Sequence, residues 1–235
     1  MVFKMKIEYL GHSAFRITGS KTIIIDPYLN KNPKACLKAS DIKKADIVLV
    51  THGHGDHLGD SLEICKNTGA VFVAIHELIL YAQENGIAKT EGMNIGGTIE
   101  IEGITITAVR ADHSSCINVT DKGGYSGGNP IGFVVRDGNK AIYHAGDTGL
   151  FKDMKLIGEL YKPDVALLPI GSRYTMGPRE AAYAAKYLKS KIIVPMHYNT
   201  TPLIRQNPSE LKMFIKEFEL DAEVNILDPG DCFEI

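Results

Sequence analysis

Four side chains of metal-binding types fall within six consecutive residues, in the segment His52-Gly53-His54-Gly55-Asp56-His57. The segment follows an apolar run at residues 46–50, so it lies on a loop where a strand ends. Its two glycines allow backbone angles that turn side chains inward at two points. Neutral imidazole and carboxylate suit zinc and neighbouring transition ions, and no cysteine lies nearby to indicate a thiolate-rich structural site. A solvated polar turn would rarely gather three of the eight histidines of the chain. The segment therefore predicts a metal centre.

Short apolar runs rich in β-branched residues predict the strands that position this loop. They lie at residues 22–25, 46–50, 70–74, 104–109, 131–135, 165–168 and 192–194. Several are apolar at consecutive rather than alternate positions, which indicates sheets covered on both faces. The pattern predicts an α/β fold with helices outside the sheets.

Helix signals fall between these runs. Asp60 with Glu63 resembles a capping box that opens a helix toward Asn67. Residues 207–210 combine a cap, a proline and a glutamate at the start of another helix. Residues 177–180 open an alanine-rich stretch at residues 181–188, which predicts a third helix. The glycine-rich residues 123–130 predict a loop between two strands, and we hypothesise that residues 123–128 form a mobile lid.

The size and composition of the chain predict a single domain over residues 1–235 of an ordinary globular protein. A formal charge of −2 gives no basic excess of the kind that nucleic-acid binding requires. The four cysteines form no Cys-x-x-Cys pair, which favours free thiols in a reducing compartment. No signal-peptide pattern and no apolar stretch of membrane-spanning length occurs, so we expect a cytoplasmic protein without a membrane partner. The sequence leaves the oligomeric state open, a homo-oligomer included.

The pattern His52-x-His54-x-Asp56-His57 resembles the signature of the metallo-β-lactamase superfamily. Other stretches are similar to its small branch of uncharacterised metal-dependent hydrolases, which includes proteins like ascorbate-6-phosphate lactonase. These stretches lie at residues 11–15, 25–27, 111–115, 127–130, 145–148, 174–178 and 195–198. The resemblance spans nearly the whole chain and implies a four-layer αββα sandwich with metal ions at one edge.

The resemblance also implies a ligand set for two divalent ions. One ion would be held by His52, His54 and His113, the other by Asp56, His57 and His197, with Asp147 between them. Zinc is the expected metal, and manganese, iron, nickel or cobalt are alternatives. In such proteins a carboxylate at the position of Asp26 orients the metal loop. The alternative for Asp26 is an ordinary turn residue before a proline.

A pair of ions in this arrangement implies hydrolysis by a hydroxide that bridges them. The expected substrate is a small molecule with an ester, lactone or phosphodiester bond. Asp56 or Asp147 would accept or relay the proton, as the catalytic residues of the chain.

Four residues near these positions are candidate substrate contacts: His12, Arg173, Tyr174 and Tyr198. An arginine beside the metal ions could bind a carboxylate or phosphate with two hydrogen bonds, although exposed loop arginines are usually only solvated. His12 is as compatible with a plain turn histidine. His144, on an apolar strand, is better explained as a core histidine with its hydrogen bonds made.

Two other functions compete with small-molecule hydrolysis. A small nuclease or RNA phosphodiesterase would share the fold and motif, but the slightly negative charge and the lack of room for a cap domain argue against it. A metal- or ligand-binding sensor without turnover would have little reason to keep a complete ligand set. The sequence therefore favours a metal-dependent hydrolase.

Overall fold

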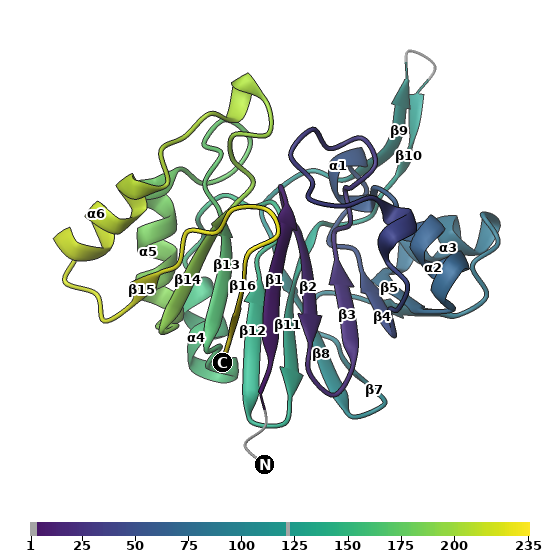
Figure 1. Ribbon diagram of the computed structural model, residues 1–235, viewed down its shortest axis with the longest axis horizontal. Helices are drawn as coiled ribbons and strands as arrows, with labels where there is room; N and C mark the ends of the chain where they lie inside the picture. Colours follow the sequence, from purple (N-terminus) through teal and green to yellow (C-terminus); the bar gives the residue numbers. More distant parts are fainter. Residues whose placement is uncertain (1–3, 121–122) are drawn as a thin grey trace.

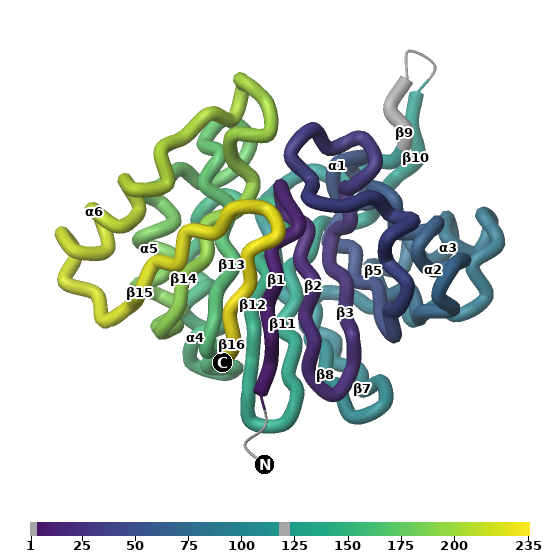
Figure 2. Tube along the Cα trace, viewed as in Figure 1, coloured from purple at the N-terminus to yellow at the C-terminus, as the bar shows by residue number. Residues whose placement is uncertain are grey.

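The computed structural model describes residues 4–120 and 123–235, and two seven-stranded sheets dominate it. The first sheet has the order β16-β1-β2-β3-β4-β5-β6, with antiparallel pairs from β16 to β3 and parallel pairs from β3 to β6. Its strands are β1 (Lys6–Gly11), β2 (Ala14–Thr18), β3 (Thr22–Ile25), β4 (Ile47–Leu49), β5 (Val71–Ile75), β6 (Thr90–Met93) and β16 (Cys232–Glu234). Figure 2 shows the C-terminal strand lying beside β1.

The second sheet has the order β15-β14-β13-β12-β11-β8-β7. Its pairs are parallel from β12 to β15 and antiparallel from β12 to β7. Its strands are β7 (Thr98–Ile101), β8 (Ile104–Arg110), β11 (Ile131–Asp137), β12 (Lys140–His144), β13 (Val165–Pro169), β14 (Ile192–Met196) and β15 (Glu223–Val224). A separate hairpin joins β9 (Cys116–Thr120) and β10 (Gly123–Ser126).

Helices cover the outer face of each sheet (Figure 1). Helices α2 (Ser61–Thr68) and α3 (His76–Glu84) contact β5 of the first sheet. Helix α5 (Pro178–Leu188) contacts β13 of the second sheet, and it packs between α4 (Met154–Tyr161) and α6 (Ser209–Glu217). Three short turns complete the set: α1 (Gly55–Leu58), η1 (Ala39–Asp41) and η2 (Pro202–Ile204). This arrangement confirms the predicted four-layer αββα sandwich.

The apolar runs of the strands are explained by burial on both faces. In β11, Phe133 and Val135 belong to the core between the two sheets, whereas Val134 faces the core under α4, α5 and α6. Full burial of such side chains contributes about 1.5–3 kcal/mol each. No helix among the described residues is both long and apolar enough to cross a bilayer.

The predicted strands and helices are confirmed, with boundaries that differ by at most two residues, but two local predictions are wrong. Asp60 precedes α2 without capping it. Its carboxylate instead accepts hydrogen bonds from the backbone N–H groups of Leu29 and Asn30, both at 2.8 Å, and ties that loop to the helix. The predicted loop over residues 123–130 contains a strand, because Gly123–Ser126 pairs with β9. Residues 121–122 lie outside the described part of the chain.

Candidate metal centre

The residues of metal-binding types meet at one edge of the sandwich, because each follows the end of a strand. In Figure 1 this edge is at the top, where α1 lies. The strands β4, β8, β12 and β14 lead to the predicted ligands, β3 leads to Asp26, and the turn between β1 and β2 carries His12. The predicted ligands are His52, His54, Asp56, His57, His113, Asp147 and His197.

Their side chains form three overlapping groups, and within each group the ligand atoms lie within 4.8 Å of one another. The groups are His52 with His54 and His113; His12 with Asp56, His57 and His197; and His52 with His57 and Asp147. The structure thus brings together every residue predicted as a metal ligand, and adds His12 to the second group.

Asp147 lies between the groups. Its Oδ1 atom is 3.2 Å from Nε2 of His57, and its Oδ2 atom is 3.0 Å from Nε2 of His197 and 3.5 Å from Nε2 of His113. The carboxylate is 3% exposed, so solvent does not compete for its oxygens. One buried carboxylate therefore faces imidazoles of both predicted sites.

The donor set fits a divalent metal ion. Nε2 of His57, Oδ1 of Asp147 and both ring nitrogens of His197 are buried, and they have no hydrogen-bond partner of acceptable geometry among the described residues. Buried polar atoms without a partner are costly, and they are rare unless an ion or water satisfies them. Nε2 of His57 and Nε2 of His197 lie 3.2 and 3.0 Å from the oxygens of Asp147, close enough for these groups to share a cation.

Asp26 orients two of these ligands, His57 by direct contact and His52 through Thr51. One carboxylate oxygen lies 2.7 Å from Nδ1 of His57 and accepts the hydroxyl hydrogen bond of Thr51, also at 2.7 Å. The other oxygen accepts the backbone N–H of Thr51 at 2.8 Å. The Thr51 hydroxyl lies 3.0 Å from Nδ1 of His52. This network fixes the rings of His52 and His57, and it leaves Nε2 of His57 facing Asp147 and Nε2 of His52 facing Nδ1 of His54, at 3.0 Å.

The pKa values of the titratable side chains shift in different directions within the cluster. Burial lowers the pKa of His52 well below its usual value, which keeps that imidazole neutral. Burial also opposes the charged form of His57, but the carboxylates of Asp147 and Asp26 outweigh it and raise the pKa of His57. Burial would raise the pKa of Asp147, yet His197 and His57 hold it well below the usual range. The cluster thus holds a carboxylate at neutral pH and stabilises positive charge beside it.

His12 contacts the cluster directly, which a plain turn histidine would not do. Its Nε2 atom is 3.1 Å from Oδ2 of Asp56, and its Nδ1 atom is 2.8 Å from the hydroxyl of Thr200. Its carbonyl accepts the backbone N–H of His197 at 2.8 Å, which joins the two sheets at the site. Both His12 and His197 have positive φ, of 60° and 55°, a conformation that non-glycine residues adopt at a cost and often at functional sites.

The other residues singled out in the sequence have different surroundings in the structure. Tyr198 lines a cavity of about 260 Å³ together with His12. Arg173 and Tyr174 contact each other, with the guanidinium 5.6 Å from the ring centre, and Tyr174 is 52% exposed. His144 is fully buried and makes hydrogen bonds with the Ser13 carbonyl and the Gly146 N–H, which confirms its reading as a core histidine.

Sequence reasoning missed the hydroxyl groups of Thr51 and Thr200, which contact His52 and His12. Ser115 adjoins His113 in the sequence, and its hydroxyl accepts the N–H of Gly53 at 3.1 Å. The one available signal was their position next to strand ends or ligands, which many threonines and serines share.

The family model described as a Beta-lactamase superfamily domain matches residues 21–198 of this chain. The chain belongs to the metallo-β-lactamase superfamily. A UPF0173 metal-dependent hydrolase of Methanopyrus kandleri is 55% identical over 231 residues, which cover 98% of this chain and 100% of that protein. A UPF0173 metal-dependent hydrolase of Methanosarcina mazei is 48% identical over 233 residues, 98% of this chain and 99% of that protein.

A solved structure gives the same result. Igni18, a metallo hydrolase from the hyperthermophilic archaeon Ignicoccus hospitalis, superposes with a TM-score of 0.89 at 41% identity. The match covers 99% of this chain and 98% of that one. The chain is therefore a metal-dependent hydrolase of this superfamily. The likeness to ascorbate-6-phosphate lactonase stays a prediction.

Proposed function

We propose that this metallo-β-lactamase superfamily protein is a dinuclear hydrolase that cleaves an ester, lactone or phosphodiester bond of a small molecule. His52, His54 and His113 would hold one ion, Asp56, His57 and His197 the other, and Asp147 both. The observation that carries the proposal is the set of buried, unpartnered ligand atoms around Asp147. Zinc is the metal we expect, with manganese, iron, nickel or cobalt as alternatives, because the donors are all imidazole and carboxylate.

Two such ions lower the pKa of water and polarise a substrate carbonyl or phosphoryl oxygen, so no serine or cysteine nucleophile is needed. The chain supplies the geometry for this chemistry. Asp26 and Thr51 orient His52 and His57 through the hydrogen bonds described above. Rigid placement of this kind lowers the reorganisation that the reaction requires.

Of the two predicted catalytic carboxylates, Asp56 is the better placed to move a proton. Its side chain is 42% exposed, whereas that of Asp147 is 3% exposed. Its Oδ2 atom also contacts Nε2 of His12, which in turn contacts Thr200, so a proton on Asp56 has a path away from the site. Asp147, enclosed by imidazoles, serves as a ligand.

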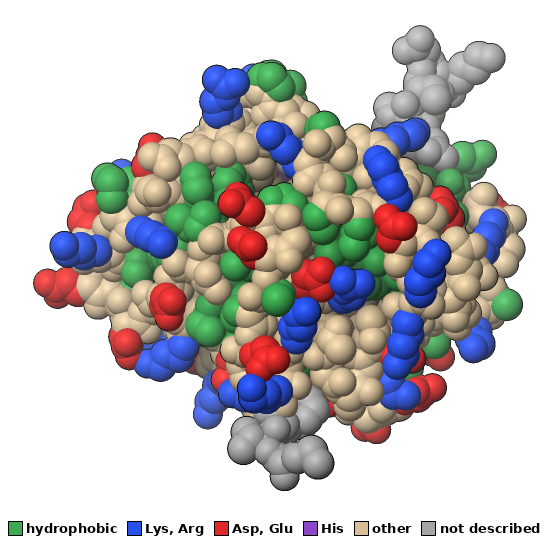
Figure 3. Space-filling view, in the orientation of Figure 1, with side chains coloured by type: hydrophobic (Ala, Val, Ile, Leu, Met, Phe, Trp, Pro, Cys, Tyr) green, Lys and Arg blue, Asp and Glu red, His purple; other side chains and the backbone are tan. Residues whose placement is uncertain are grey.

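A small molecule is the substrate class we propose, in a cytoplasmic setting. On the face drawn in Figure 3, acidic and basic side chains are interspersed, without the basic stripe that a nuclease uses to follow a phosphate backbone. The cysteines Cys36, Cys65, Cys116 and Cys232 are free, which supports a reducing compartment.

The test uses protein stripped with a chelator and reloaded with zinc or manganese. We expect turnover of bis-p-nitrophenyl phosphate or of a member of a lactone panel after reloading, and none before it. Reloaded Asp56→Asn protein that binds a full complement of metal should turn over about 10²–10⁴-fold more slowly, as expected when a proton-transfer group is removed. Full activity of the stripped protein, or of the variant, would contradict the mechanism.

A further inference from the structure

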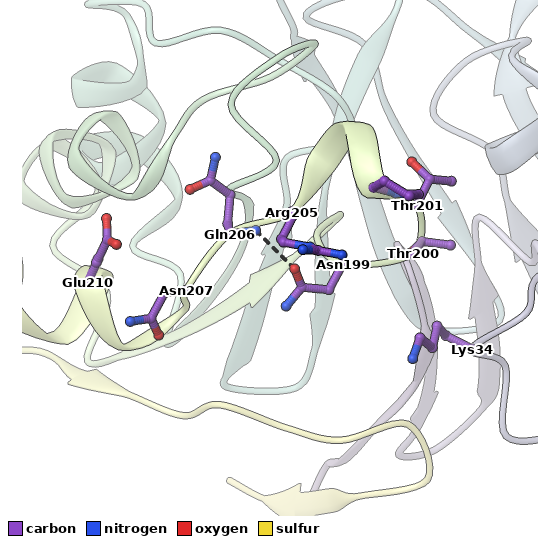
Figure 4. A pocket seen from close by; sticks show the side chains of 9 residues that line it. Lys34, Asn199, Thr200, Thr201, Arg205, Gln206, Asn207 and Glu210 are labelled. Atoms are coloured by element: carbon purple, nitrogen blue, oxygen red, sulfur yellow. Dashed lines mark hydrogen bonds between the residues drawn. The ribbon is translucent and has the colours of Figure 1, made fainter.

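A polar groove lies next to the metal centre, on the side of His12. Its volume is about 810 Å³, and its walls come from two distant segments of the chain. Lys34 comes from the loop after β3, and the remaining lining residues follow β14: Asn199, Thr200, Thr201, Pro202, Arg205, Gln206, Asn207 and Glu210. Figure 4 shows Lys34 on one side and the segment with Arg205 on the other.

The groove reaches the metal centre through Thr200. This threonine lines the groove, and its hydroxyl contacts Nδ1 of His12, whose Nε2 contacts Asp56. Lys34, Asn199 and Thr200 also line the smaller cavity that contains His12. A molecule bound in the groove therefore lies two hydrogen bonds from a predicted metal ligand.

The two cations of the groove have no competing partner. Among the described residues, neither the ammonium group of Lys34 nor the guanidinium of Arg205 forms an ion pair or a hydrogen bond. Glu210, which also lines the groove, lies away from Lys34 in Figure 4. The end of the groove near Thr200 is thus electropositive, with donors available for an anion.

The backbone fixes both walls in advance. Asn199 has a φ of 58°, its side-chain oxygen accepts the N–H of Gln206 at 2.9 Å, and its own N–H donates to the carbonyl of Ile204 at 2.9 Å. Ile204, next to Arg205, is 3% exposed and anchors the loop. On the other wall, the N–H of Lys34 donates to the side chain of Asn32 at 2.8 Å. Because the backbone of both walls is fixed, binding of a ligand has to order only the side chains of Lys34 and Arg205.

We propose that Lys34 and Arg205 bind an anionic group, a carboxylate or phosphate, at the end of the substrate remote from the bond that is cleaved. The inference rests on the proposed function, and it narrows the substrate class to small acidic esters, lactones or phosphodiesters. The paired cations set specificity, while the neighbouring metal centre performs the cleavage.

A binding experiment tests the groove without any turnover. Metal-free protein is titrated calorimetrically with succinate and with inorganic phosphate, so that no metal ion competes for the anion. The double variant Lys34→Gln with Arg205→Gln should bind the preferred anion about tenfold more weakly, or worse, which corresponds to the loss of charge-assisted hydrogen bonds. The matched control Lys212→Gln removes an exposed cation of α6 that does not line the groove, and it should bind like the unmodified chain. The tighter of the two anions identifies the class.

A kinetic experiment completes the test with two esters of equal chain length. Mono-p-nitrophenyl succinate carries a remote carboxylate, and p-nitrophenyl butyrate does not. In metal-loaded protein, the double variant should lower the ratio of kcat/KM for the acidic over the neutral ester about tenfold. Unchanged anion binding and an unchanged ratio would overturn the role of the groove while leaving the hydrolase intact. Hydrolysis of neither ester would remove esters from the proposed substrate class, and the calorimetry would still decide the role of the groove.

Discussion

The two halves of the metal centre differ in exposure and in what holds them. His57, Asp147 and His197 are at most 3% exposed, and Asp26 supports His57 directly. His52 is also fully buried, whereas His113 and Asp56 lie nearer to solvent, at 12% and 42% exposed. We infer that the buried half fixes the geometry of the site, whereas the exposed half admits substrate and exchanges protons.

The largest effect is expected from the centre of the buried half. Asp147→Ala removes the carboxylate that faces both groups of ligands, so we expect loss of metal and a fall in kcat/KM of about 10²–10³-fold or more. Asp137→Ala is the matched control, since this buried carboxylate lies on the second sheet at the far end of β11 and contacts Ser20. Assays at equal total zinc, with thermal unfolding to confirm the fold, would measure the difference. Equal activity of Asp147→Ala and the control would show that the carboxylate of Asp147 matters no more than a buried carboxylate outside the site.

Truncation in the exposed half should have a more limited effect on metal content. His54→Ala removes one ligand of the first group and leaves the second intact, so we expect the protein to keep about one of two equivalents of metal, consistent with three protein ligands per site. Elemental analysis after dialysis checks this. Loss of both ions would show that the two groups of ligands bind metal as one unit.

The network behind the ligands gives the next effect. Asp26→Asn keeps the size of the side chain but disturbs its contacts with His57 and Thr51, so metal affinity should fall about 10–100-fold. Asp46→Asn is the control, because Asp46 accepts the N–H of Thr22 beside a strand without touching the site. Competition with a chelator of known affinity measures both variants. A similar fall in metal affinity in the control would show that Asp26 stabilises the fold and does not specifically support the metal ligands.

The smallest effect is expected at His12, which contacts Asp56 without being needed for the fit of the other ligands. His12→Gln should leave the metal content unchanged and lower kcat about tenfold, in line with the loss of a hydrogen bond to a charged group. Steady-state kinetics on metal-replete protein separates kcat from KM. If the variant loses an equivalent of metal instead, His12 is a ligand of the second ion.

Local patterns in the sequence predicted the parts of the structure that local physics controls. The apolar runs predicted the strands because those strands are buried on both faces. The helix predicted to open at residues 177–180 is confirmed, and the N–H of Gly177 donates to the carboxylate of Glu180 at 3.1 Å. The segment His52–His57 predicted a metal loop because its side chains and glycines are neighbours in sequence. The ligands at residues 113, 147 and 197 came from the family resemblance, since nothing local connects them to the loop.

Contacts between distant segments could not be predicted from the sequence. His12 contacts Asp56 and Thr200, 44 and 188 residues away, because the two sheets pack with those loops at a common edge. The groove between Lys34 and Arg205 has the same origin. The strand Gly123–Ser126 was missed because pairing with β9 outweighs the low strand preference of glycine.

Elemental analysis of the purified protein, beside Asp147→Ala, tests the central claim most directly. We expect about two equivalents of a transition metal per chain, because the groups of potential ligands overlap around the carboxylate of Asp147. The variant should hold far less metal. A folded chain that takes up no metal after incubation with zinc or manganese would contradict the account.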